Sequence, residues 1–204
     1  MCFNPEVSII TYIVGVLGCL YLMKQDYTSE SIFFLWVIHM QLIEFFLWKN
    51  QPCNNNNKII GKIGMIVNNM EPIILWLAII YFSRKRLPNW MHFIMILFLL
   101  TTLYISYKSY IKDHCTIVTP ESSPHLDWLW NNKGDYNVLY YLFFLIVCIL
   151  LSIYGLTFGY HAALIFFISF IVSLIIYRKS KSVGAMWCFF AAFVPLLIPT
   201  IYKI

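Results

Sequence analysis

Residues 137–177 read NVLYYLFFLIVCILLSIYGLTFGYHAALIFFISFIVSLIIY and contain no acidic residue, lysine or arginine. A bilayer-spanning helix needs about 20 mostly apolar residues, so this stretch is long enough for two such helices. Gly155 and Gly159 stand near its middle, where glycines indicate a turn. The stretch therefore predicts two membrane-spanning helices joined by a tight hairpin. A single over-long hydrophobic segment is the alternative.

The same pattern, an apolar run bounded by charged or turn-rich residues, recurs along the whole chain. It predicts seven spans, at 8–24, 30–48, 60–82, 90–108, 137–154, 157–177 and 183–202. Of the 204 residues, 61% are hydrophobic and 11% are charged, whereas soluble domains average about 45–50% and 25%. This composition excludes a soluble enzyme, a disordered protein, a coiled coil and a disulfide-rich secreted domain. We expect an all-α polytopic membrane protein with a single domain over residues 1–204, in which 109–136 forms a polar loop.

Seven spans place the N-terminus and the connections after spans two, four and six on one membrane face, which we name face A. The opposite face is face B. Face A holds nine of the 14 lysine and arginine residues, and face B holds five. The positive-inside rule then predicts a cytoplasmic face A and N-terminus, although residues 84–86 (Arg-Lys-Arg) form a dense cluster on face B. These charges orient the chain among lipid headgroups, so the expected partner is the lipid bilayer and not a nucleic acid.

The loop on face A between spans two and three contains the run Asn54–Asn57, which we expect to be solvated. Four of the six cysteines also fall on or near face A; they are Cys2, Cys53, Cys115 and Cys188. In a cytosolic setting their thiols stay reduced, whereas an inverted topology allows a disulfide between the loops at Cys53 and Cys115. The other two cysteines lie inside spans and are interpreted as small core residues.

Two carboxylates lie inside apolar runs, where ionisable groups are costly and are therefore candidates for function. The first, Glu44, lies one turn from the face A end of the second span and shares a helix face with Gln41 and Trp48. Trp48 is the expected interfacial anchor. The alternative for Glu44 is a hydrated carboxylate at the membrane boundary.

The second carboxylate, Glu71, lies midway along the third span and precedes Pro72, where a kink or a break is expected. Asn68 and Asn69 stand beside the carbonyls that the proline leaves unpaired. A polar, interrupted helix at mid-membrane is the pattern that transporters use for ion sites. The alternative is a kink whose polar side chains satisfy one another across helices. His39, in the second span, is interpreted as a hydrogen-bonded core histidine.

A metal site at face A is a further hypothesis. Four candidate ligands approach the same membrane depth from this side; they are Cys2, Glu44, His125 and Cys188. Thiolate, imidazole and carboxylate groups are the ligands that zinc prefers. Three protein ligands and a water would form a catalytic site with Glu44 as a ligand or general base, and four would form a structural site. The alternatives are a redox pair of Cys2 with Cys188, a nucleophilic or lipidated Cys2, and ordinary packing roles.

Four short segments carry a resemblance to a known family: MCFNPEVS at the start, MQLIEFFLWKN at 40–50, HLDWLW at 125–130 and GAMWCFF at 184–190. Together they resemble an uncharacterised family of small polytopic membrane proteins of giant viruses, algae and bacteria, whose bacterial members share the MCF start and a WCF segment near the end. The resemblance implies a shared set of positions: Cys2, Gln41, Glu44, Trp48, His125, Trp128, Trp187 and Cys188. It implies no activity.

Three functions stay open. The first is a membrane-embedded, zinc-dependent hydrolase acting on a lipid or small amphiphile, with the metal at the four ligands named above. The second is an ion channel or transporter, active as one chain or as a homo-oligomer, with a polar path at Asn68, Asn69 and Glu71. The third is a structural protein of a viral or organelle membrane. Retinal is excluded as a cofactor, because residues 183–202 contain no lysine for a Schiff base.

Overall fold

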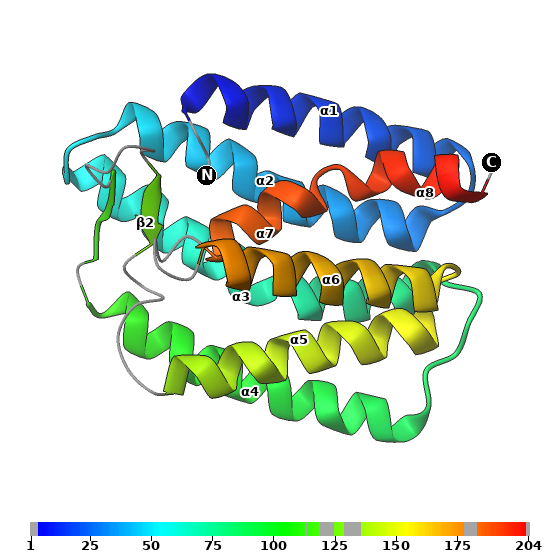
Figure 1. Cartoon of the computed structure of the whole chain (residues 1–204). Coiled ribbons are helices and arrows are strands. Elements are labelled where there is room, and N and C mark those ends of the chain that lie inside the picture. Colours follow the sequence, from blue (N-terminus) through cyan, green and yellow to red (C-terminus); the bar gives the residue numbers. More distant parts are fainter. Residues whose placement is uncertain (1–3, 113, 119–124, 129–135, 178–182, 203–204) are drawn as a thin grey trace.

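The computed structural model describes residues 4–112, 114–118, 125–128, 136–177 and 183–202 (Figure 1). The elements in chain order are α1 (Pro5–Lys24), α2 (Thr28–Lys49), α3 (Asn55–Phe82), α4 (Asn89–Tyr110), β1 (Thr116–Val118), β2 (Leu126–Trp128), α5 (Tyr136–Gly155), α6 (Gly159–Tyr177), α7 (Val183–Ala191) and α8 (Val194–Tyr202). Seven helical segments are long and apolar enough to cross a membrane, and the seventh consists of α7 and α8 together. The prediction of a multi-pass, all-α protein with seven spans is confirmed.

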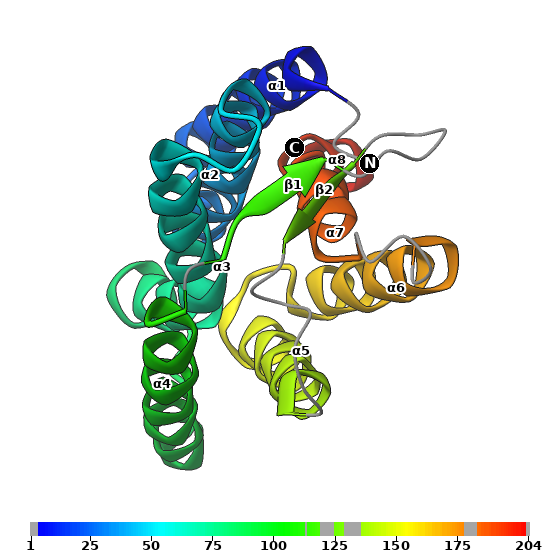
Figure 2. The ribbon, with the colours of Figure 1, turned by 90° about the vertical axis from the view of Figure 1, so that its left-hand side faces the viewer.

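The helices form one bundle in which neighbours in sequence are mostly neighbours in space. α1 packs on α2 and α8, α2 packs on α3 and α7, and α3 packs on α4 and α5. α5 packs on α6 and α6 on α7, so the seventh span returns to the inner side of the arc that α1–α4 form (Figure 2). Large apolar side chains such as Leu17, Phe93 and Leu100 stay exposed on the outer helix faces. Exposed apolar surface of this kind fits contact with lipid.

The hairpin predicted at residues 155–159 is present, since α5 ends at Gly155 and α6 begins at Gly159. Three side chains hold this turn at face B, one from α2 and two from the connection between α3 and α4. The Ser83 hydroxyl donates to the Gly155 carbonyl (2.6 Å), and Lys85 donates to the carbonyl of residue 156 (2.5 Å). The N–H of residue 157 donates to Glu30 Oε1 (2.7 Å). We name Glu30, Ser83, Lys85 and residues 155–157 the face B clasp.

The seventh span is interrupted, whereas the sequence predicts a continuous helix over 183–202. Ala192 and Phe193 separate α7 from α8, and Pro195 lies at the second position of α8. A proline has no N–H to donate to the carbonyl four residues earlier and clashes with it, so a helix does not continue through it easily. Gly15 of α1 accommodates the interruption, because a Cβ there would lie 3.1 Å from the Ala192 carbonyl oxygen.

The third span behaves in the opposite way, because α3 continues through Pro72 without a break. Of the kink or break expected at Pro72, the break is therefore excluded, and a kink stays a prediction. The turn before the proline receives a hydrogen bond from a neighbouring helix, since the Trp36 indole N–H of α2 donates to the Val67 carbonyl (2.9 Å). The carbonyl that Pro72 leaves without its helical donor is that of Asn68, four residues earlier.

We expect Gly159→Ala to destabilise the fold. A Cβ on Gly159 would collide with the backbone carbonyls of Ser152 and Ile153, and backbone in a tight turn has little room to move. Overpacking of this kind lowers the free energy of unfolding by about 1–3 kcal/mol, which thermal unfolding of the detergent-purified protein measures. Gly18→Ala is the matched control, because its Cβ would meet only side-chain atoms of Pro195 and Leu196, at 3.0–3.2 Å. Equal melting temperatures for the two variants would contradict this account.

Candidate functional site

A short β-hairpin lies over the face A end of the bundle. β1 and β2 pair antiparallel, with Thr116 opposite Trp128 and Val118 opposite Leu126. Figure 2 looks onto this end and shows both strands in front of the helices. Leu126 and Trp128 are buried in an apolar cluster with residues of α2, α3 and α7, among them Cys188. We name residues 115–118 and 125–128 the cap.

The loop between α2 and α3 and the first turn of α3 hold the cap in place. Asn57 donates to the Thr116 carbonyl (2.8 Å) and accepts from the Thr116 N–H (2.9 Å), as a paired strand would. Its amide also donates to the Asn50 carbonyl (3.1 Å), and the Gln51 amide donates to the Thr116 carbonyl (2.9 Å). A disulfide between Cys53 and Cys115 joins the same two segments covalently. The cap is therefore fixed by both hydrogen bonds and a covalent bond.

The expected solvated loop at Asn54–Asn57 is wrong for its last residue, because Asn57 is fully buried. Asn55 and Asn56 are exposed, as predicted. Asn54 is the N-cap of α3 and accepts from the Asn57 N–H (2.8 Å), which explains why the helix begins at Asn55 and not at residue 60. Asn57 thus belongs to the first turn of α3, where its side chain faces the cap.

Beneath the cap lie the polar residues of α2 that the sequence singled out. Gln41 and Glu44 are fully buried, and Trp48 on the same helix face is half-buried. His125, in the cap itself, is 2% exposed. This burial argues against the alternative of a hydrated carboxylate at Glu44.

Three of the four segments that carry the family resemblance meet at this place. Residues 40–50 lie on α2, 125–128 in the cap and 184–190 on α7, and each contributes side chains to one apolar cluster that includes Met40, Trp128 and Cys188. Cys2, in the fourth segment, lies outside the described residues. Of the positions implied by the resemblance, Trp48, Trp128 and Cys188 are therefore gathered from distant parts of the chain into one cluster.

A second group of polar residues lies deeper, between α3, α4, α5 and α7. Glu71 is 4% exposed, and its Oε1 lies 4.0 Å from the Cys188 sulfur, the outer limit for a hydrogen bond from a thiol. The side chains of Asn68 and Tyr141 are hydrogen-bonded, and Tyr140, Tyr141 and Cys148 lie close enough to Glu71 to interact with its charge. We name this group the polar core; its members are Asn68, Asn69, Glu71, Thr102, Tyr140, Tyr141, Cys148 and Cys188.

The polar core also links helices to one another. The Asn69 amide donates to the Ser106 hydroxyl of α4 (3.0 Å), and the hydroxyls of Thr102 and Tyr140 are 3.2 Å apart. Two other buried atoms, Asn68 Nδ2 and Asn69 Oδ1, have no hydrogen-bond partner within the part of the chain that the structure describes. Such atoms are rare inside proteins and indicate a place for water or a ligand.

Cys188 connects the two regions that the sequence treats as separate hypotheses. It packs in the apolar cluster under the cap, and its sulfur approaches Glu71 of the polar core. Neither Tyr140 nor Tyr141 is among the residues that the sequence singled out. Two adjacent hydroxyl-bearing residues at the start of an otherwise aliphatic span were the available signal.

The remaining predicted residues have local, structural partners. His39 lies 2.6 Å from the Leu35 carbonyl through Nδ1, which confirms its interpretation as a hydrogen-bonded histidine. The Trp187 indole N–H donates to the Ser169 hydroxyl (3.0 Å), and its ring packs against Phe144 and Phe170. Trp187 is therefore a packing residue on the side of α7 that faces α5 and α6.

The zinc site stays a prediction. Across the described ranges, no group of three or more histidine, cysteine, aspartate or glutamate side chains stands close enough together to hold a metal ion. Cys2, the fourth proposed ligand, lies outside those ranges. Glu44, His125 and Cys188 therefore do not make a three-ligand site by themselves.

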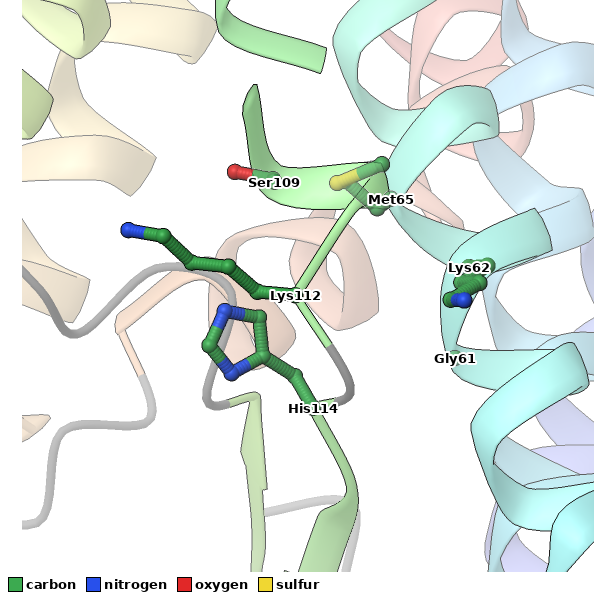
Figure 3. A pocket seen from close by; sticks show the side chains of 6 residues that line it. All are labelled: Gly61, Lys62, Met65, Ser109, Lys112 and His114. Atoms are coloured by element: carbon green, nitrogen blue, oxygen red, sulfur yellow. The ribbon is translucent and has the colours of Figure 1, made fainter. Parts of the chain in front are cut away.

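A small basic pocket lies on the outside of the same end of the bundle (Figure 3). Lys112 and His114 extend to the same side beyond α4, near the Ser109 hydroxyl, and Lys62 approaches from α3. The Lys62 ammonium lies 4.7 Å from the centre of the Tyr110 ring. The cavity volume is about 10 Å³, which is room for a single water molecule. This pocket is too small for an organic substrate.

No family model, no curated protein and no solved structure matches the chain. The resemblance to the family of small polytopic membrane proteins accordingly stays a prediction. The candidate site is defined by its own geometry: a polar core inside seven spans, below a cap that a disulfide fastens.

We expect Asn57→Ala to loosen the cap. The variant removes the side-chain hydrogen bonds to the backbone of Asn50 and Thr116 and leaves buried backbone groups without those partners, at a cost of about 1–3 kcal/mol. The melting temperature should fall, and dithiothreitol should reduce the Cys53–Cys115 bond faster. Asn56→Ala is the matched control, since Asn56 is exposed and makes one 3.4 Å hydrogen bond to Asn50 Oδ1. Identical melting and reduction rates for both variants would show that Asn57 does not hold the cap.

Proposed function

We propose that the chain is a membrane transport protein that passes protons through the polar core, with Glu71 as the group that binds and releases the proton. The observation that carries this proposal is the position of Glu71, a carboxyl group that is 4% exposed and lies midway along a membrane-spanning helix. Ionisable side chains in such positions are costly, face the interior of the bundle and mark proton relays and ion pathways.

The surroundings of Glu71 support a proton path. The Cys188 thiol, the Tyr140 and Tyr141 phenols and the Asn68 amide place several groups that donate or accept hydrogen bonds around one carboxyl group. Asn68 Nδ2 and Asn69 Oδ1 lack partners among the described residues, so water molecules at these atoms would satisfy them. A hydrogen-bonded chain of such waters and hydroxyl groups can transfer a proton from one group to the next.

The interrupted seventh span supports the same proposal. Cys188 lies one turn before the interruption at Ala192–Phe193, and its sulfur approaches Glu71. Transporters build their ion sites beside helices that are interrupted at mid-membrane, because the helix ends expose backbone groups there. Non-helical backbone at this depth is tolerated where protein or a water-filled cavity surrounds it.

Two other functions fit the geometry less well. A zinc-dependent hydrolase needs three ligands in one place, and the described residues do not bring three together. A purely structural role is consistent with the hydrogen bonds from Asn69 and Tyr140 to α4. That role does not require an ionisable group at position 71, however, because a glutamine can make the same packing contacts.

The proposal predicts proton flux that depends on Glu71. A potassium gradient with valinomycin sets a membrane potential that drives protons across the vesicle membrane. The internal pH of vesicles containing the purified chain, read by a pH-sensitive dye, should then change faster than that of empty vesicles. Glu71→Gln keeps the side-chain shape and removes the titratable group, so the flux should fall at least tenfold while the melting temperature stays close to that of the wild type. Glu6→Gln is the matched control, because Glu6 is exposed at the start of α1 and its change should leave the flux intact. Wild-type flux equal to that of empty vesicles, or full flux in Glu71→Gln, would refute the proposal.

Elemental analysis of the same preparations tests the hydrolase hypothesis directly. A zinc site at Cys2, Glu44, His125 and Cys188 requires about one metal ion per chain and its loss in Cys188→Ser, because a tetrahedral site rarely keeps zinc without one of its ligands. On the transport proposal, the wild type and Cys188→Ser should both be free of stoichiometric metal. Purification without a metal-affinity step avoids carry-over. One zinc per wild-type chain would favour the enzyme over the transporter.

A further inference from the structure

The disulfide of the cap joins two loops that lie on the same membrane face. Cys53 precedes α3 and Cys115 precedes β1, and 62 residues separate them in the sequence. Their Cα atoms are 5.5 Å apart, within the usual range for a disulfide. Cys53 is exposed, and Cys115, the first residue of the cap, is buried. The bond therefore lies at the aqueous edge of face A and not inside the bundle.

Hydrogen bonds bring the two cysteines together independently of the disulfide. Asn57 and Gln51, on the Cys53 side, bind the backbone of Thr116, the residue after Cys115. The fold thus places two thiols in contact in any compartment. Whether they stay thiols depends on the compartment, since disulfides persist in oxidising environments and are rare where glutathione and thioredoxin keep thiols reduced.

We infer that face A, with the N-terminus and the cap, faces an oxidising compartment, and that face B is cytosolic. The bond forms by exchange: the Cys53 and Cys115 thiols give up two protons and two electrons to a protein or small-molecule disulfide, which leaves as two thiols. The inference concerns the orientation of the chain and does not depend on what the polar core does.

The distribution of positive charges favours the opposite orientation. Counting lysine and arginine residues favours a cytoplasmic face A by nine to five. Three of the face A lysines lie over aromatic rings at 4.6–5.9 Å; they are Lys49 on Phe45, Lys62 on Tyr110 and Lys108 on Tyr104. Such pairs anchor a helix end at either membrane surface. On face B, residues 84–86 are exposed directly after α3, as expected at a cytosolic boundary. The positive-inside rule is a statistical bias, whereas a disulfide that persists needs an oxidising compartment to maintain it.

Labelling in intact bacterial cells tests the orientation, because the oxidising compartment there is the periplasm, which an impermeant maleimide reaches without entering the cytosol. In a Cys2→Ser background, Cys115→Ser leaves Cys53 as an exposed thiol, while Cys19, Cys148 and Cys188 are buried in spans. A membrane-impermeant maleimide should label this variant equally in intact and permeabilised cells. The Cys2→Ser parent, with both loop cysteines, should be labelled only after reduction. Labelling that requires permeabilisation, or labelling of the parent without reductant, would overturn the inference.

A second readout uses the unaltered sequence, so it does not depend on how a cysteine variant folds. Seven spans place the end of α8 on the face opposite the N-terminus. A fluorescent protein fused after residue 204 should therefore fluoresce, because it lies in the cytosol, and alkaline phosphatase fused at the same point should be inactive. Active phosphatase and a dark fluorescent protein would place face B outside and contradict the inference.

Discussion

Every backbone N–H and carbonyl that crosses hydrocarbon must find its hydrogen-bond partner inside the protein, and the rest of this structure follows from that requirement. Six spans, α3 through Pro72 among them, meet it as continuous helices, and the seventh is interrupted. The carbonyl of Val67, in the turn before Pro72, accepts the Trp36 indole N–H, and the interruption before Pro195 lies against Gly15 of α1. The polar core lies beside these two places. The polar core therefore lies near positions where a proline withholds a helical donor.

The same requirement shapes the two ends of the bundle, and it is met differently on each face. At face B, Glu30, Ser83 and Lys85 satisfy backbone groups of the turn at residues 155–157. At face A, Asn57 and Gln51 satisfy the backbone of Thr116, and a disulfide is added. Opening the bundle at face B breaks the hydrogen bonds of the clasp and the apolar packing of Leu156 and Phe158, whereas opening it at face A also has to distort a covalently closed loop. A transport cycle with one mobile end is therefore expected to use the face B clasp.

The spans could be predicted from the sequence because hydrocarbon selects for long apolar runs, and Gly155 and Gly159 marked the hairpin correctly. The contacts between spans could not be predicted. Asn57 is indistinguishable in sequence from the three asparagines before it, yet it alone is buried under the cap. Glu30 lies at the edge of an apolar run, where a carboxylate is usually solvated. The approach of Cys188 to Glu71 depends on the lateral order of the helices, which hydropathy does not encode.

The two leading hypotheses for this protein require different chemistry from one sulfur atom. A zinc ligand is a thiolate, because coordination removes its proton. A donor to the Glu71 carboxyl group is a thiol, because only the S–H can be shared with Oε1. The 4.0 Å approach of the Cys188 sulfur to Oε1 fits the second role and uses a residue that the first role needs. A thiol also suits the boundary between the apolar cluster and Glu71. It is apolar enough to pack against the cluster, and its S–H can still donate weakly to the Glu71 carboxyl group.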